Sequence, residues 1–267
     1  MRFAIAYSIK DKAGINIVNQ LKKANYLPHV PIIELKKETV YSEDISAKKY
    51  PELRNVDFLI FASKHQSKEK TPSLSLHAPG NFRNADFGGK PGKVCNTSAF
   101  VLKYLFKELN KNANESEELK DKYKITLECT HHGPLIDIPC CFIELGSSEA
   151  QWGDEIAASV IAKTIASLQN YKKGNWIPCL VVGGGHYNHA GNKIMLRTNY
   201  AIGHIIPKYL LPITTPIINE AVLKTQENFD TVLLDWKGLG GYKQETVSLI
   251  KKAGLNYKKV QRILKEE

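Results

Sequence analysis

The stretch Asp57-Phe58-Leu59-Ile60-Phe61-Ala62 is a nearly continuous apolar run in a chain of 267 residues. A run of this length without alternation is typical of a β-strand that is covered on both faces. Around it, the sequence alternates between such strands and amphipathic helices. This alternation predicts an α/β fold with a mixed, largely parallel central sheet and helices on both faces.

The same reading places the other elements along the chain. Strands are expected at residues 3–8, 57–62, 74–77, 123–128, 139–144, 178–182 and 231–234. Helices are expected at residues 14–24, 98–109, 148–169, 215–225 and 244–252. Ser148 and Gln151 form a capping box at the start of the longest helix. The expected organisation is one α/β domain over residues 1–267, with smaller elements packed against the main sheet.

The chain carries a net charge of +10, with a pI of about 9.2. Only five of its 37 basic residues are arginines. Lysine suits contacts with phosphate, whereas bidentate reading of bases favours arginine. The composition therefore favours recognition of the backbone or end of a polyanion, although a lysine surplus also serves solubility and accompanies thermophilic proteomes.

Five cysteines are present without a Cys-x-x-Cys pair. Most lie in or beside apolar runs, where a free thiol behaves as a small hydrophobic group, so disulfides are not expected. The apolar run at the N-terminus is too short for a signal peptide, and no window approaches the length of a membrane span. A cytoplasmic protein is expected.

Five of the eight histidines fall in three loops bounded by glycine or proline. The loops are residues 75–81 with His77, residues 130–134 with His131 and His132, and residues 183–189 with His186 and His189. Each loop follows an expected strand. Because side chains at the carboxyl ends of neighbouring strands converge on one crevice, the three loops predict a single polar site.

Imidazole serves both as a transition-metal ligand and as a general base near neutral pH. Glu128 and Glu144 are placed to bind zinc through oxygen or to orient an imidazole. The spacing does not separate these roles, and it matches neither a zinc finger nor His-Glu-x-x-His. A purely structural role, in which the histidines cap strands by hydrogen bonding, stays open. His29 and His65 are expected to be surface or loop residues and are assigned no role.

The triple glycine at residues 183–185 lacks both the Gly-x-Gly-x-x-Gly order and the Lys-Ser/Thr of a P-loop. A nucleotide site is therefore not inferred from it. Its open backbone amides are instead candidates for an oxyanion hole or for holding a terminal phosphate.

Several strings together resemble the archaeal and plant type of D-aminoacyl-tRNA deacylase. They are residues 75–81, Glu-Cys-Thr-His-His-Gly-Pro at 128–134, residues 144–149 with Trp152, Gly-Gly-Gly-His-Tyr at 183–187, and residues 203–209. The resemblance implies a fold related to peptidyl-tRNA hydrolase and the phosphorylase/hydrolase group, hydrolysis of the ester between a D-amino acid and the tRNA 3′ end, and zinc as the cofactor. Asn188 and His189 depart from it, because a small residue and a proline are expected there.

The residues and the resemblance together suggest roles for individual residues. The expected catalytic residues are His77, His131, His132, His186 and Glu128, and the expected metal ligands are His77, His131, His132, His186 and Glu144. The expected substrate-binding residues are Asn81, Gly133, Gly184, Gly185, Tyr187 and Lys208. The expected partners are the aminoacylated acceptor end of tRNA and the D-amino acid product, without membrane or DNA. The lysines 251, 252, 258 and 259 would hold the acceptor stem largely without base reading.

Other functions remain open on the residues alone. A peptidyl-tRNA hydrolase or another metal-assisted hydrolase on the same scaffold would use the same histidines. An enzyme like purine-nucleoside phosphorylase would need phosphate and would release a free base. A non-catalytic RNA-binding module would keep its binding when the histidines are changed.

Overall fold

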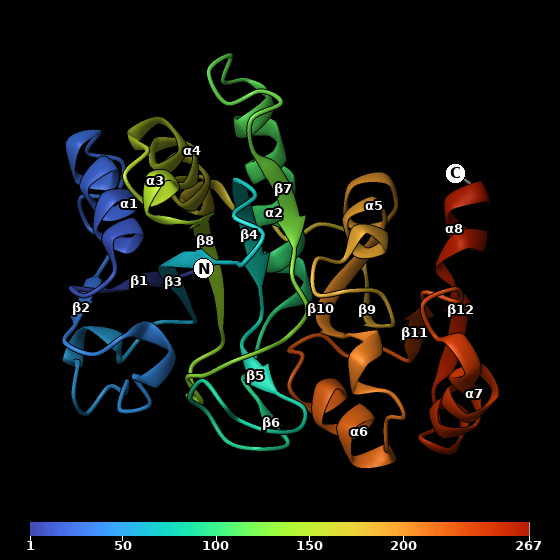
Figure 1. Cartoon of the computed structure of the whole chain (residues 1–267). Helices are drawn as coiled ribbons and strands as arrows, with labels where there is room; N and C mark the ends of the chain where they lie inside the picture. The colour runs from blue at the N-terminus through green and yellow to red at the C-terminus, as the bar shows by residue number, and fades with distance from the viewer. Residues whose placement is uncertain (267) are drawn as a thin grey trace.

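The computed structural model describes residues 1–266, which form two β-sheets side by side with helices packed around them (Figure 1). The larger sheet has six strands in the order β2-β1-β3-β8-β4-β7. Its strands are β1 (Phe3–Ser8), β2 (Ile32–Leu35), β3 (Phe58–Gln66), β4 (Ser73–His77), β7 (Lys124–Leu127) and β8 (Cys140–Ser147). Every neighbouring pair is parallel except β4 and β8, which are antiparallel. The predicted mixed, largely parallel α/β fold is confirmed.

The smaller sheet is parallel throughout, in the order β10-β9-β11-β12. Its strands are β9 (Ile177–Val182), β10 (Tyr200–Ile206), β11 (Thr231–Leu234) and β12 (Asn256–Lys259). A short antiparallel pair, β5 (Gly80–Asn81) and β6 (Lys93–Val94), completes the strands. The helices are α1 (Lys12–Lys23), α2 (Ala99–Asn114), α3 (Glu149–Trp152), α4 (Glu155–Ala166), α5 (His189–Arg197), α6 (Thr215–Leu223), α7 (Lys243–Lys252) and α8 (Val260–Glu266). Within residues 1–266, no helix is long and apolar enough to cross a membrane.

Apolar side chains fill three layers around these sheets. One core lies beneath α1, α2 and α4 and joins them to a shared side of both sheets. A second core lies between α6, α7 and the other face of the smaller sheet. The remaining face of the larger sheet packs against the irregular segment 36–56 through Ile45 and Leu53, seen at the lower left of Figure 1.

The segment 127–130 joins the two sheets by backbone hydrogen bonds. The amide of Asn188 donates to the carbonyl of Leu127 at 2.9 Å, and the amide of Cys129 donates to that of His186 at 2.9 Å. The amide of Thr130 donates to the carbonyl of Ile205 at 3.0 Å. The residues after β7 are therefore fixed to the ends of β9 and β10.

The helix predicted over residues 148–169 is wrong as a single element. The capping box of Ser148 and Gln151 is present, but α3 ends at Trp152. The carboxylate of Asp154 then accepts hydrogen bonds from the amides of Ile156 and Ala157 and starts α4 as a new helix. A second N-cap within a few residues outcompetes continuation of the first helix.

Lys103 is a fully buried cation between α2 and the smaller sheet. Its ammonium donates hydrogen bonds to the carbonyls of Met195, Thr198 and Tyr200 at 2.9, 2.6 and 2.8 Å. The charge thereby satisfies carbonyl groups at the C-terminal end of α5 and the beginning of β10.

Candidate active site

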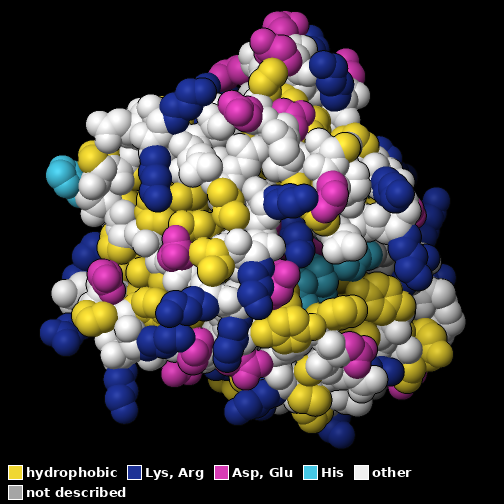
Figure 2. Space-filling view, turned by 60° about the vertical axis from the view of Figure 1, so that its left-hand side comes forward, with side chains coloured by type: hydrophobic (Ala, Val, Ile, Leu, Met, Phe, Trp, Pro, Cys, Tyr) yellow, Lys and Arg dark blue, Asp and Glu magenta, His cyan; other side chains and the backbone are white. Residues whose placement is uncertain are grey.

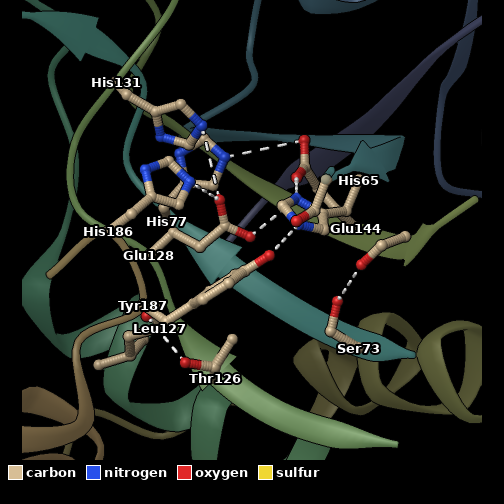
Figure 3. A network of polar contacts seen from close by, with 12 residues as sticks. His65, Ser73, His77, Thr126, Leu127, Glu128, His131, Glu144, His186 and Tyr187 are labelled. Carbon is tan, nitrogen blue, oxygen red and sulfur yellow. Dashed lines mark hydrogen bonds and ion pairs between the residues drawn. The ribbon is translucent and has the colours of Figure 1, made fainter. Parts of the chain in front are cut away.

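The three histidine loops follow β4, β7 and β9 and meet at one point. Isolated bridges pair Pro79 with His131 and Glu128 with Tyr187. The ring centroids of His77 and His131 lie 4.3 Å apart, and those of His131 and His186 lie 4.5 Å apart. The convergence expected from the sequence is therefore found in the fold (Figure 3).

Two consecutive histidines serve the same cluster because of the backbone at His132. In a strand, neighbouring side chains point to opposite faces. His132 has a φ of 45°, a left-handed conformation that is uncommon for residues other than glycine. Its ring consequently lies 4.3 Å from that of His131 and 4.8 Å from that of His77, measured between centroids.

The face of the larger sheet supplies two further side chains. Glu144 in the middle of β8 is paired with Ser75 of β4 and Ser63 of β3, so these residues share one face. His65 lies two residues beyond Ser63 and therefore projects from the same face. Its Nδ1 is 3.1 Å from an oxygen of Glu128 and 3.4 Å from an oxygen of Glu144.

The prediction that His65 is a surface or loop residue is wrong. β3 continues to Gln66, four residues beyond the predicted strand, and the His65 side chain is only 5% exposed. Its Nε2 hydrogen-bonds the hydroxyl of Tyr187 at 2.7 Å. The missed signal was the alternation of Phe61, Ser63 and His65 beyond the end of the apolar run.

Two buried carboxylates connect the histidines. Glu128 lies 2.9 Å from Nε2 of His186 and 3.5 Å from Nε2 of His131. Glu144 lies 3.7 and 3.8 Å from Nε2 of His77 and His132. Burial acts to raise the pKa of both carboxyl groups, but the surrounding imidazoles outweigh it and lower the pKa of Glu128 and, more strongly, that of Glu144. Both groups are therefore carboxylates.

Three of the imidazoles are held in the same tautomer. Nδ1 of His77 lies 3.3 Å from the carbonyl of Ala78, Nδ1 of His131 lies 2.9 Å from that of Cys129, and Nδ1 of His132 lies 2.6 Å from that of Gly133. Because a carbonyl only accepts, each Nδ1 carries the proton. In its neutral form, each ring then has its lone pair on Nε2. Burial, followed by the neighbouring histidines, lowers the pKa of His131 well below its usual value, which keeps this ring neutral.

His186 has the opposite electrostatic environment. Burial acts to lower its pKa, but hydrogen bonds with Cys129 and Glu128 outweigh burial and raise the pKa to about 10. Its Nδ1 lies 3.4 Å from the Cys129 sulfur, which is also 3.1 Å from the hydroxyl of Tyr209. His186 is therefore an imidazolium beside the Glu128 carboxylate.

Three sets of side chains place ligand atoms within 4.8 Å of one another. The sets are His77, His131 and His132; Cys129, His131 and His186; and His65, Glu128 and Glu144. Within residues 1–266, the buried His77 Nε2 has no hydrogen-bond partner, and the buried Glu128 Oε1 has none beyond its ion pair with His65 Nδ1 at 3.1 Å. Orphaned polar atoms of this kind fit an absent ligand. The three-imidazole set leaves room for water or substrate, as a catalytic zinc site does.

A cavity of about 920 Å³ opens onto the cluster. Its lining includes His131, His132, His186 and Glu144. Figure 2 shows histidine side chains at the bottom of a hollow, with Lys and Arg side chains on one side and hydrophobic side chains on the other. The lining contains the basic residues Lys64, Lys68, Lys70 and Arg83 and the apolar or aromatic residues Phe82, Phe87, Tyr209 and Leu210.

The residues expected to bind substrate are distributed more widely. Asn81 lines the cavity, and its amide donates to the carbonyl of Gly88 at 2.8 Å. The Gly133 amide donates to the Phe87 carbonyl at 2.8 Å, and the backbone amide of Lys208 donates to the Gly184 carbonyl at 2.9 Å. Among the described residues, the cavity lining does not include Gly133, Gly184, Gly185, Tyr187 or Lys208. His189 is exposed at the first turn of α5, outside the cluster.

His204 is also buried, but it contacts neither Glu128 nor Glu144. Its Nδ1 lies 3.1 Å from the hydroxyl of Thr130, which itself accepts the amide of Ile205 at 3.2 Å. Its Nε2 donates to the carbonyl of Lys224 at 3.4 Å. Burial lowers the pKa of His204 to about 4, so this ring is neutral at physiological pH.

Comparisons with known proteins agree with this geometry. A family model for D-aminoacyl-tRNA deacylase matches residues 52–258. The D-aminoacyl-tRNA deacylase of Pyrococcus horikoshii is 34% identical over 271 residues, which cover 92% of this chain and 96% of the relative. That of Thermococcus kodakarensis is 37% identical over 188 residues, covering 69% of this chain and 66% of the relative.

A solved structure extends the likeness to the whole fold. It is a crystal structure described as a conserved protein of unknown function, with 28% identity and a TM-score of 0.89. The alignment covers 99% of this chain and 97% of that chain. Together with the matched family model and the archaeal relatives, it shows that this chain belongs to the D-aminoacyl-tRNA deacylase family, whose substrate is tRNA.

Proposed function

We propose that this protein hydrolyses the ester between a D-amino acid and the 3′ end of tRNA and releases the free D-amino acid and tRNA. The observation that carries the proposal is the set of three imidazoles, each held at Nδ1 by a backbone carbonyl, that lie with two buried carboxylates beside an open cavity. Ester hydrolysis needs an activated water and a proton for the departing oxygen. The cluster offers groups for both.

The proton steps are assigned to Glu128 and His186. The Glu128 carboxylate accepts a proton from the water as the water oxygen bonds to the ester carbonyl carbon. When the bond from that carbon to the ribose oxygen breaks, the His186 imidazolium gives its Nε2 proton to the ribose oxygen. The proton on Glu128 then passes to His186 across their 2.9 Å contact, which restores both groups.

We further propose that zinc is the cofactor and that His77, His131 and His132 hold it. These imidazoles, each oriented by a backbone carbonyl on Nδ1, match the way in which proteins prepare histidines for zinc. When bound, zinc would polarise the ester carbonyl and lower the pKa of water towards about 7. Glu144, 3.7 and 3.8 Å from the Nε2 atoms of His77 and His132, would supply negative charge beside the bound ion.

The test is the deacylation rate of D-tyrosyl-tRNA against L-tyrosyl-tRNA, measured with purified protein whose metal content has been determined. We expect rapid turnover of the D form alone and zinc in the active protein. Equal rates on both forms, or none on either, would overturn the proposed reaction. Activity that persists unchanged after complete zinc removal would overturn only the metal assignment.

A further inference from the structure

We infer that the cavity is a binding site for the unpaired 3′-terminal nucleotides of tRNA, with the terminal base stacked on Phe87 and the preceding phosphates held by Lys68 and Lys70. This inference rests on the proposed function, because the ester to be cleaved is attached to the terminal ribose. It adds the part of the substrate that is common to every tRNA.

The size and position of the cavity require more than an amino acid. Ligand pockets usually measure about 300–1,000 Å³, and this one, at about 920 Å³, lies near the upper end. Because the histidines form part of the lining, a ribose that brings its ester to them carries its base into the same cavity. The phosphates of the preceding nucleotides then lie towards the opening.

Phe87 has the exposure and the support of a stacking platform. Its side chain is 66% exposed although it lines the cavity. Its backbone is fixed, because the Phe87 carbonyl accepts the amide of Gly133 at 2.8 Å and the next carbonyl, of Gly88, accepts the Asn81 side chain. A rigidly mounted, exposed aromatic ring binds an unpaired base at little cost in entropy.

The loop that carries Phe87 packs closely against the turn that contains His131, His132 and Gly133. A Cβ atom on Gly133 would come within 2.4 Å of the Gly89 amide nitrogen and 2.5 Å of the Val40 carbonyl oxygen. The Gly89 amide also donates to a carboxylate oxygen of Glu43 at 2.6 Å. The distance between the Phe87 backbone and the histidines is therefore set by backbone contacts.

Lys68 and Lys70 supply positive charge at the cavity on either side of Glu69 in the sequence. Both are exposed on the connection between β3 and β4, and both line the cavity. Neither forms an ion pair with any residue in 1–266, whereas Lys64 lies 3.3 Å from Glu38. Exposed lysines that form no ion pair at the edge of a cavity are suited to the phosphates of a single strand.

The first experiment replaces Phe87 and follows two charged tRNAs. Phe87→Ala should lower kcat/KM about 5- to 150-fold, the range for loss of one base–aromatic stack, and should do so equally for D-tyrosyl-tRNA and D-aspartyl-tRNA. Phe87→Trp should retain activity, and the control Tyr242→Ala, 42% exposed outside the cavity lining, should be unaffected. A loss confined to the tyrosyl substrate would place Phe87 against the amino acid and overturn the inference.

The second experiment replaces the lysines and varies salt. Lys68→Ala/Lys70→Ala should reduce the slope of log affinity for uncharged tRNA against log salt by about 1.4, since each phosphate contact on a single strand contributes about 0.7. The matched control is Lys120→Ala/Lys122→Ala, which removes two exposed lysines from the loop before β7. An unchanged slope in the first variant would contradict the phosphate assignment.

Binding of uncharged tRNA separates this inference from the proposed reaction. Intact tRNA should bind more tightly than tRNA trimmed of its terminal adenosine, and Phe87→Ala should abolish that difference. This result would support the site even if the wild-type protein hydrolysed no D-aminoacyl-tRNA. Equal binding of intact and trimmed tRNA by the wild-type protein would overturn it.

Discussion

Acidification should destabilise the protein through His204. The pKa of this buried histidine is about 4 in the folded protein, against a usual value of 6.5. Between these two pH values the unfolded chain binds more protons than the folded one, so the free energy of unfolding falls as pH falls. Applying the linkage relation to these two pKa values gives a loss of about 2 kcal/mol between pH 7 and pH 5.

The assay is equilibrium unfolding in urea at pH 7 and pH 5, for the wild type and His204→Asn. Asparagine does not titrate, and it keeps an acceptor for the Thr130 hydroxyl, which bonds Nδ1 of His204 in the wild type. Protonation of the other groups changes the free energy of unfolding equally in both proteins, so it cancels when the two are subtracted. The stability advantage of the wild type over the variant should shrink by about 2 kcal/mol from pH 7 to pH 5.

A change smaller than about 0.5 kcal/mol in that advantage would refute the reasoning. It would mean that His204 gains its proton at the same pH in both states. Either the ring would then be accessible to water, or a partner that stabilises its cation would lie beside it. The 1% exposure and the contacts with Thr130 and Lys224 exclude both in the present geometry.

The remaining predictions concern the cluster and the core. His132→Ala should lower D-tyrosyl-tRNA deacylation at least about tenfold and reduce bound zinc, whereas His189→Ala should do neither; a smaller loss in single-turnover assays would remove His132 from the catalytic centre. His65→Gln should lower kcat or zinc affinity about 10- to 100-fold, because Glu128 and Glu144 lose the group that orients them, and unchanged values would leave His65 without a positioning role. Lys103→Met should lower the free energy of unfolding by about 3 kcal/mol, because three carbonyls lose a charged donor, and an equally stable variant would contradict this account.

Much of the fold could be predicted from local patterns. Continuous apolar runs located the buried strands, and capping residues located the starts of several helices. The directions in which the strands pair could not be predicted in this way, because the antiparallel contact of β4 with β8 depends on residues about 70 positions apart. Helix α5 was missed since its nine residues include only four apolar side chains, and its start depends on the Asn188 side chain accepting the amide of Gly191.

The candidate site was predictable where glycine and proline mark the ends of strands. His77, His131, His132 and His186 stood out for that reason, and the structure brings their rings together. His65 lies just past an apolar run, and its alternation with Phe61 and Ser63 was the only local signal for it, because its carboxylate partners are distant in sequence. Its role follows only from the register of β3 against β8.

The segment 127–130 makes catalysis and architecture inseparable. Its backbone hydrogen bonds join the two sheets, and Glu128, which belongs to this segment, faces the histidines. If these hydrogen bonds break, His186, which follows β9 of the smaller sheet, moves away from Glu128 and His131, which follow β7 of the larger sheet. We therefore expect activity to be lost on heating at or before the temperature at which the helices melt. Activity would thus serve as a measure of whether the junction between the two sheets is intact.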